Sequence, residues 1–534
     1  MTAWPFERSA PISGGPVTDA PGSDGPVSDG PVTDGPVTDG VAPPPAGAET
    51  SLITPALMGF GAVLAISIGG TLAGSPYDVH LPGAWTFGMG RISTGIRSVG
   101  EAGVFAGMAV LLIAWYRILS YLRRRPDTPT RAVLLVFGVW VVPLLIAPPL
   151  FSEDAYSYVA QGTMVVHGIN PYRNGPVVLA LEDPQVVSRV DPIWQTTPVP
   201  YGPLFLGLEA AAVEPTGQHE PAAIEELRVL AVVGVLLGAA AIPTLARRWR
   251  TPPSLATALL VLSPLTLLGL ISPGHNDALM AGLLLGALAL SERGRPALAV
   301  GVCALAAAVK APALIGTAFV LWQWMGAQPS WRARLRVIAV TVAITLAVLE
   351  ALALITTVGW GWISTLGTPG LVHSVLTPTT DLALLGEKFV HIIGFGPATG
   401  SLLGASRAVG YIAATAITAW LLRRHTGTGV LLPLALGLLV FVALGPIFQP
   451  WYLAWGLFCL APAATGQWQV LLIGVTTFAT VASLPRFEPL VSSTGWAGDV
   501  FGLAALVALA ALASPRLTDK VPYLPRLLGV QASS

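Results

Sequence analysis

Charged residues are scarce in this chain. Asp, Glu, Lys and Arg together make up only 10% of its 534 residues, whereas about a quarter is usual in soluble domains. Hydrophobic residues account for 53% of the chain. This composition excludes an ordinary water-soluble globule. It predicts an all-α polytopic membrane protein, because helices satisfy their own backbone hydrogen bonds in lipid.

Other absences narrow the function further. The 28 basic residues are balanced by 28 acidic ones, so there is no excess of positive charge to suggest a nucleic-acid partner. The only cysteines, Cys303 and Cys459, lie inside apolar runs, which favours small buried side chains over a disulfide or a metal site. No internal repeat is evident, although many transporters are built from two repeated halves.

The first 50 residues have few large apolar side chains. They repeat Gly-Pro-Val-Thr/Ser-Asp and then run into three consecutive prolines, a composition typical of disordered segments. They also lack the basic start and apolar core of a signal peptide. We therefore interpret residues 1–50 as a disordered cytoplasmic tail that precedes an uncleaved first span.

Residues 51–515 are expected to form one multispan domain. Apolar runs of about 17 to 25 residues predict transmembrane helices, and the shorter runs predict tilted, broken or re-entrant ones. We count fourteen such runs, at 52–74, 101–119, 132–150, 227–246, 254–271, 277–291, 296–310, 311–325, 337–358, 403–422, 429–447, 452–465, 469–485 and 498–513.

Basic residues indicate how these spans are oriented. Arginine clusters such as Arg123–Arg125 and Arg423–Arg424 fall in alternate connections, which the positive-inside rule assigns to the cytoplasm. Both termini, including a tail at 516–534, are then cytoplasmic. The remaining connections face outward from the plasma membrane, and the longest polar one is 151–226. Chemistry is expected on this outer face.

The outer loop opens with two adjacent carboxylates, Glu153 and Asp154. Ser152 is a typical N-cap residue, so the sequence predicts a helix over 152–166 with both acids in its first turn. A capped surface helix without any catalytic role explains the same pattern. At helical spacing one face of this helix carries Asp154, Tyr158 and Gln161.

Two further outer connections contain unusual polar residues. His275, Asn276 and Asp277 occupy a tight turn, in which Asn276 or Asp277 serves equally well as a helix cap. Lys310, just before Pro312, is the lone ionisable residue of a long apolar stretch. Burying an unpaired lysine costs much free energy, so Lys310 predicts a functional site, here one that binds phosphate. We favour this over a lysine whose side chain merely extends to the membrane interface.

Aromatic residues accompany these polar groups. Tyr172, next to Arg173, and Tyr201 lie in Pro- and Gly-punctuated stretches that hold a loop rigid, and Gln449 and Trp451 flank a proline-broken span end. Aromatic rings offer faces for the C–H surfaces of a sugar. They equally anchor loops at the level of the lipid headgroups.

The whole set of motifs resembles the membrane glycosyltransferases that use polyprenyl-phosphate sugars, the GT-C type. More narrowly, it looks like the actinobacterial polyprenol-phosphate-mannose-dependent α-1,6-mannosyltransferases that build lipomannan cores. The resemblance implies about 14 transmembrane helices with a large first catalytic outer loop containing short helices. It covers roughly residues 50–515 and rests on segments 152–162, 168–172, 198–203 and 274–278 and on Lys310.

The resemblance also implies a mechanism, in which mannose moves from polyprenyl-phosphate mannose to a lipid-anchored mannan acceptor. A lipid phosphate leaves readily, so a cation is needed more than an acid. Lys310 is our candidate, with His275 or Arg173 assisting at the donor phosphate. Asp154 is the candidate base for the attacking hydroxyl, with Glu153 as runner-up or as a holder of the acceptor, and one inverting displacement gives an α-1,6 linkage. Candidate substrate-binding residues are Tyr158, Tyr172, Tyr201, Asn276, Asp277, Gln449 and Trp451.

Alternatives stay open at this point. Carboxylates such as Glu153, Asp154 and Asp277 suit a divalent cation, but Lys310 fills that role at the phosphate, so neither a metal nor a cofactor is expected. An arabinofuranosyl or protein O-mannosyl transferase would use the same class of donor. A lipid-linked-sugar flippase or transporter would carry its charges deep in the membrane instead of in an outer loop. Expected partners are the donor, the acceptor and membrane lipid, with no nucleic acid.

Overall fold

The chain folds into helices. The computed structural model describes residues 51–73, 85, 93–217, 219–371, 376–394, 399–424 and 429–484, and every regular element within these ranges is helical, which confirms the all-α class. Three sequence-based assignments lie outside the described residues: the tail at 1–50, the span at 498–513 and the tail at 516–534.

Within the described ranges, five helices are long and apolar enough to cross a membrane. A bent pair, α10 (Pro253–Val261) followed by α11 and η2 (together Pro264–Ile271), makes a sixth candidate span with a 41° bend. Pro264 lies at this break, and it cannot donate the backbone hydrogen bond that a continuous helix needs. The five long helices are α1 (Ile53–Ala73), α3 (Thr94–Arg124), α9 (Glu220–Trp249), α15 (Trp331–Ile355) and α17 (Thr399–Arg424).

The other predicted runs within the described residues form shorter helices. Between α13 and α14, Lys310 adopts an extended conformation, so the stretch 296–325 forms two separate helices. The shorter helices are α4 (Thr130–Ile146), α12 (Asp277–Glu292), α13 (Pro296–Val309), α14 (Leu314–Gly326), α16 (Pro378–Ile392), α18 (Leu431–Leu444), α19 (Ala454–Leu460) and α20 (Gln467–Ala482), with 3-10 turns η3 (Ala311–Ala313), η4 (Gly361–Ile363), η5 (Thr368–Leu371), η6 (Pro450–Leu453) and η7 (Ala461–Ala463).

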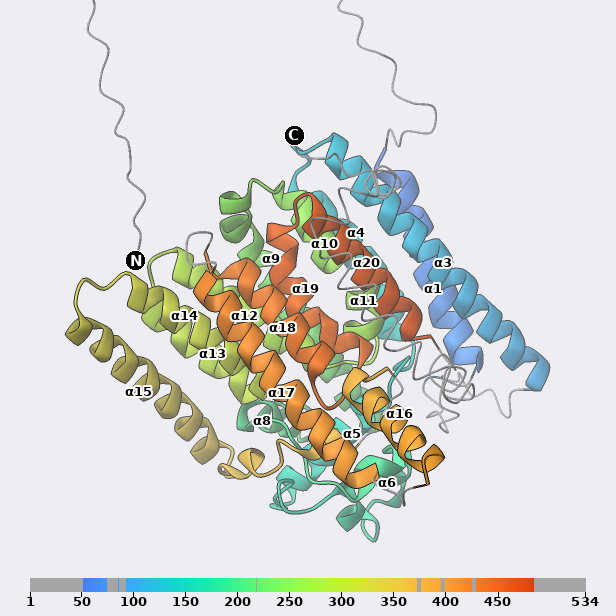
Figure 1. The fold of residues 1–534 in the computed structure, drawn as a ribbon. Helices are drawn as coiled ribbons and strands as arrows, with labels where there is room; N and C mark the ends of the chain where they lie inside the picture. Colours follow the sequence, from blue (N-terminus) through green and yellow to red (C-terminus); the bar gives the residue numbers. More distant parts are fainter. Residues whose placement is uncertain are drawn as a thin grey trace, which may run out of the picture. The chain divides into compact units, whose positions relative to one another are not determined.

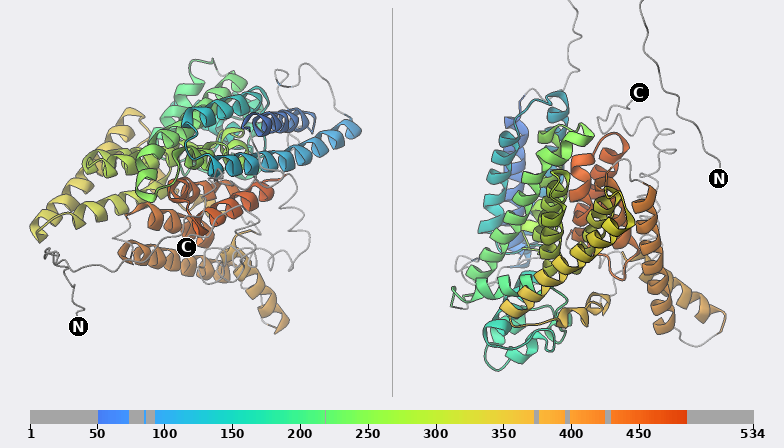
Figure 2. Two further views of the ribbon diagram at one scale, coloured as in Figure 1. Left: turned by 90° about the horizontal axis from the view of Figure 1, so that it is seen from above. Right: turned by 90° about the vertical axis from the view of Figure 1, so that its left-hand side faces the viewer.

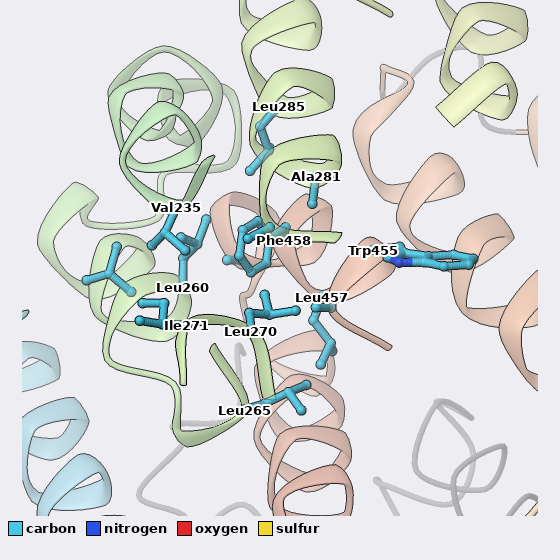
Figure 3. Close-up of a cluster of buried hydrophobic side chains, with 14 of the residues drawn as sticks. Val235, Leu260, Leu265, Leu270, Ile271, Ala281, Leu285, Trp455, Leu457 and Phe458 are labelled. Atoms are coloured by element: carbon cyan, nitrogen blue, oxygen red, sulfur yellow. The ribbon is translucent and has the colours of Figure 1, made fainter. Parts of the chain in front are cut away.

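Close contacts between small residues hold the central helices together. A side chain at Gly282 of α12 would collide with the backbone of Gly234 in α9, so the two helices approach more closely than larger residues would allow. Beside this contact, apolar side chains from α9, α10, η2, α12 and α19 interdigitate (Figure 3). This cluster joins early and late parts of the chain, and it includes Val235, Leu260, Leu270, Leu285 and Phe458.

Segment 151–213 consists of short helices at one end of the long ones (Figures 1 and 2). The connection between α3 and α4, which carries Arg123–Arg125, lies at the opposite end. Gly162 packs directly on the backbone of Glu209, which brings two of the short helices, α5 and α8, together. The short elements are α5 (Asp154–Val166), η1 (Pro176–Leu179), α6 (Pro184–Arg189), α7 (Pro192–Gln195) and α8 (Pro203–Val213).

Candidate active site

A cavity of about 980 Å³ lies between the short helices of segment 151–213 and the late helices of the chain. Its volume is at the upper end of the range of about 300–1,000 Å³ usual for ligand pockets. One part of its lining is polar and contains Glu153, Asp154, Ser157, Gln161, Asp191, Trp194, Tyr201, Lys310 and Gln449. Another part is apolar and contains Ile315, Leu376, Phe441, Val442, Ile447, Phe448 and Leu484.

Helix α5 begins at Asp154, two residues later than predicted. The buried Phe151 adopts a positive φ of 72°, which turns the chain sharply just before the acids. The Ser152 hydroxyl then accepts a hydrogen bond from the amide of Asp154, only two residues on, and Glu153 occupies the N-cap position. The prediction that Ser152 caps the helix and that Glu153 lies in its first turn was therefore wrong, although both carboxylates line the cavity.

Asp154 is held by an imidazole. Its Oδ2 atom lies 3.4 Å from Nε2 of His275, whose side chain is fully buried while that of Asp154 is 22% exposed. The ring of His275 stacks on Trp451 with 4.2 Å between centroids. His275 itself does not line the cavity, so only the carboxylate of this pair is presented to a ligand.

The local backbone explains why His275 is fixed in this position. Gly269 lies in the π-helical turn η2, in which a carbonyl pairs with the amide five residues on, but the amide of Gly274 bonds instead to the carbonyl of Ile271. Nδ1 of His275 lies 2.6 Å from the carbonyl oxygen of Gly269 and donates to it. Nε2 then faces the Asp154 carboxylate at 3.4 Å.

The two neighbouring acids differ in pKa. Burial alone would raise the pKa of Asp154, but the hydrogen bond and charge of His275, together with the charge of Lys310 and the Ser152 hydroxyl, hold it below its usual value. Burial raises the pKa of Glu153 to about 7, and the negative charges of Asp191 and Asp154 add to this shift. Asp154 thus stays ionised at neutral pH, where Glu153 is close to half protonated.

Lys310 is the second charged group of the cavity. Its Nζ atom lies 2.8 and 3.0 Å from the two carboxylate oxygens of Asp277, and it sits 4.4 Å from the centre of the Tyr452 ring. Trp455 donates its indole N–H to the same carboxylate at 2.5 Å. Asp277 is fully buried and outside the lining, whereas Lys310 belongs to it. An ammonium group has three protons, so one remains for a ligand.

Six of the twelve predicted residues do not line the cavity: His275 and Asp277, described above, and Tyr158, Tyr172, Arg173 and Asn276. Tyr158 packs edge-on against Tyr201, and Tyr172 donates its hydroxyl to the backbone carbonyl of Tyr201 at 2.9 Å. These two tyrosines therefore position Tyr201, which does line the cavity. Arg173 is exposed on the loop surface. Asn276 is buried at the start of α12 without making a side-chain cap.

The remaining predictions meet at the cavity. Tyr201, Gln449 and Trp451 all contribute to its lining, alongside Glu153, Asp154 and Lys310. Sequence reasoning missed several other lining residues. Gln161 and Ser157 could have been found from their helical spacing from Asp154, and Trp194 from its proline-rich surroundings. For Asp191, Tyr452 and Trp455 we recognised no sequence feature that indicates a site.

The sequence analysis also did not identify a fully buried arginine outside the cavity lining, Arg228. Arg228 of α9 donates to the carbonyl of Ala147 at 2.7 Å and to that of Leu144, at the C-terminal end of α4. Its side chain also packs against Gly274, next to His275. Arg228 therefore supports both chain segments that bring Asp154 and His275 together. Its signal was a charge at the start of an apolar run.

Among the described residues, no group of three or more His, Cys, Asp or Glu side chains is arranged to hold a metal ion. The charges of the cavity are instead paired with protein groups, as described for Asp154 and Lys310.

Two family models match the chain. Residues 56–326 match the model described as "Alpha-(1->6)-mannopyranosyltransferase, N-terminal domain" of the MptA/B family, and residues 379–514 match "MptB C-terminal domain". The first match contains α5, His275, Asp277 and Lys310, and the second contains Gln449 and Trp451.

Individual relatives match over most of their length. A "Probable alpha-(1->6)-mannopyranosyltransferase" of Mycolicibacterium smegmatis is 32% identical, with 81% of this chain and 83% of the relative covered. "Alpha-(1->6)-mannopyranosyltransferase A" of Mycobacterium tuberculosis is 31% identical over 81% of this chain and 84% of the relative. "Alpha-(1->6)-mannopyranosyltransferase B" of Corynebacterium glutamicum is 30% identical over 72% and 69%. No solved structure matches the chain significantly.

Proposed function

The chain belongs to the alpha-(1->6)-mannopyranosyltransferase family, and from this premise we propose that it transfers mannose from polyprenyl-phosphate mannose to a mannan or lipomannan acceptor. It is an α-1,6-mannosyltransferase with several membrane-spanning helices. To this activity the proposal adds the identity of the donor and the acceptor, the side of the membrane on which transfer takes place, and the catalytic residues.

One observation carries the proposal: a single cavity presents a carboxylate held by a buried imidazole and an ammonium held by a buried carboxylate. Glycosyl transfer from a lipid phosphate needs these two charges. The carboxylate of Asp154 accepts the proton of the attacking sugar hydroxyl. The ammonium of Lys310 stabilises the negative charge that develops on the departing phosphate.

The donor phosphate has a second attraction beside Lys310. Ala311 and Pro312, which begin the helical run leading into α14, also line the cavity. The dipole of a helix favours an anion at its start. The predicted roles of His275 and Arg173 at the phosphate do not fit as well, since His275 is buried behind Asp154 and Arg173 is exposed elsewhere on the loop.

The polyprenyl chain of the donor fits the apolar part of the lining. Side chains of α18 and of the segments flanking α16 and α20 supply this surface, including Leu376, Phe441, Val442 and Leu484. A cavity with a polar and an apolar part suits a ligand that is a sugar phosphate at one end and a hydrocarbon at the other. A soluble nucleotide sugar would gain nothing from the apolar part.

The reaction is a single displacement. The acceptor oxygen attacks the anomeric carbon of mannose as the bond from that carbon to the phosphate oxygen breaks, and the acceptor proton passes to Asp154. Polyprenyl phosphate leaves, and a β-linked donor gives an α-1,6-linked product. We place this chemistry on the outer face of the plasma membrane, in a GT-C type domain of about fourteen helices spanning residues 51–515, with cytoplasmic tails at 1–50 and 516–534.

The test is transfer of radiolabelled mannose from polyprenyl-phosphate mannose to a short α-1,6-mannoside in membranes containing the wild-type protein or Asp154→Asn. We expect Asp154→Asn to lower transfer by about 10²–10⁴-fold, because it removes the base. Immunoblotting at equal protein levels is the control. Equal transfer by both would remove Asp154 from the mechanism, and no transfer by the wild type would point to another donor.

A further inference from the structure

Helix α5 carries a row of polar side chains that continues beyond Asp154 along the cavity. Asp154, Ser157 and Gln161 are spaced by three and four residues, so they follow one another on the same side of the helix. All three line the cavity. The base is therefore one end of a longer polar surface.

The two residues beyond the base are buried but lack partners. Ser157 is 3% exposed and Gln161 is 5% exposed. Within the described part of the chain, neither the Ser157 hydroxyl nor Oε1 of Gln161 makes a hydrogen bond. Buried polar atoms without partners are rare because they cost free energy, and in a cavity wall they are satisfied when a ligand binds.

Helix α7 and its N-cap residue Asp191 supply further residues to the cavity lining. Trp194 lines the cavity and is half-buried, because it also packs on the small apolar cluster that includes Ala160 and Met164 of α5. This packing holds the indole beside the stretch of α5 that carries Gln161. Asp191 also lines the cavity, and one of its carboxylate oxygens already accepts from the amide of Ile193. A polar row that shares the lining with an indole and a carboxylate is suited to a sugar, which offers hydroxyls and a C–H face.

We propose that Ser157 and Gln161, together with Trp194 and Asp191, form an acceptor subsite that holds two consecutive mannose residues of the growing chain. The first residue presents its hydroxyl to Asp154 beside Ser157, and the second lies between Gln161 and Trp194. This inference rests on the function proposed above and assigns the acceptor to one part of the cavity.

The length of the row is the reason for two sugars. Seven residues separate Asp154 from Gln161, which is about 10 Å along a helix. A single hexose ring beside Asp154 does not reach that far, so Gln161 and Trp194 would have no partner in a monosaccharide acceptor. The site is thus built for elongation of an existing chain.

The experiment measures KM for octyl α-mannoside, for octyl α-1,6-dimannoside and for the donor, in wild type, Gln161→Met and Ser157→Ala. We expect Gln161→Met to raise KM for the disaccharide about five- to tenfold, the loss of a net hydrogen bond, and to leave the monosaccharide and donor values unchanged. Ser157→Ala should raise KM for both acceptors alike. Gln185→Met, on the exposed surface of α6, is the matched control and should change nothing.

Other outcomes would overturn the subsite. A rise in KM for the donor with Gln161→Met would show that the row binds the donor sugar instead. Equal KM values of the wild type for both acceptors would show that no second sugar is held. Trp194→Leu tests the site of the second sugar independently of Gln161. It should raise KM for the disaccharide only, and it serves as the test if Gln161→Met does not fold. Absence of transfer by the wild type to either acceptor would refute the proposed function, not the subsite alone.

Discussion

The two charged pairs of the cavity have opposite polarity. In the pair of Asp154 and His275, the carboxylate reaches the cavity and the cationic partner is fully buried. In the pair of Lys310 and Asp277, the ammonium reaches the cavity and the carboxylate is fully buried. In each pair, a fully buried side chain thus orients the charged group that faces the cavity.

The comparison teaches that the buried partners have different chemical effects. His275 both orients Asp154 and lowers its pKa, so the carboxylate stays ionised although its surroundings are largely apolar. Asp277 binds Lys310 through both carboxylate oxygens, and Trp455 fixes that carboxylate in turn. Two of the three ammonium protons of Lys310 are thereby engaged by Asp277, which fixes the direction of the third. In the proposed mechanism the first pair tunes the base, and the second orients the ammonium that donates to the phosphate.

The largest effect is expected from breaking the pair of Lys310. Lys310→Met alone leaves Asp277 buried and unpaired, which costs about 3–5 kcal/mol, so less folded protein should reach the membrane. The double variant Lys310→Met with Asp277→Asn removes both charges and keeps the acceptor for Trp455. It should restore the protein level, yet lower kcat by about 10²-fold, because the leaving phosphate loses its cation.

Protein level by immunoblot and mannosyl transfer, measured on the same membranes, separate these two effects. If the double variant transferred mannose at the wild-type rate, Lys310 would be only the counterion of Asp277. The two pairs would then not be equivalent parts of one site.

A smaller effect is expected from breaking the pair of Asp154 by replacing its buried partner. His275→Gln removes the charge and weakens the hydrogen bond that lower the pKa of Asp154, so that pKa should rise. A base is active above its pKa, and activity is lost as the pH falls through it. The acidic limb of the pH–rate profile should therefore move to higher pH, so that the loss of transfer is largest at the acidic end of the profile.

A matched control for this variant is His167→Gln in the same segment 151–213, since His167 pairs with Glu182 away from the cavity. Its pH profile should equal that of the wild type. If His275→Gln lost activity equally at every pH, His275 would act through packing alone and the imidazolium would have no role.

The smallest effect concerns the acid beside the base, which has no cationic partner of this kind. Glu153, with a pKa raised to about 7 by burial and by Asp191 and Asp154, is protonated below that pH and charged above it. A charged carboxylate accepts stronger hydrogen bonds from sugar hydroxyls. KM for the acceptor should accordingly fall about threefold as the pH rises from 6 to 8.

The variant Glu153→Gln should make KM for the acceptor independent of pH over this range while leaving the acidic limb of kcat in place. Persistence of the inflection near pH 7 in this variant would assign it to another group. Glu153 would then have no part in binding the acceptor.

Much of the class of this protein follows from local sequence. The scarcity of charge and the apolar runs predict membrane helices, since each run must bury its own backbone polar groups whatever its neighbours are. The motifs around Asp154, His275 and Lys310 indicated the family before any geometry was known. Composition and spacing are properties of a segment alone, so they are readable from it.

The pairings were decided by tertiary structure alone. Asp277 and Lys310 were assigned separately to substrate and phosphate, yet they bind each other across 33 residues. His275 was expected at the phosphate, but its Nδ1 bonds to the carbonyl of Gly269 and its Nε2 faces Asp154. Periodicity tells which face of a helix a side chain occupies. Which charge it meets there depends on how distant helices pack, and this packing alone brings Asp154 and Lys310 to one cavity, each with its fully buried partner, His275 or Asp277, outside the lining.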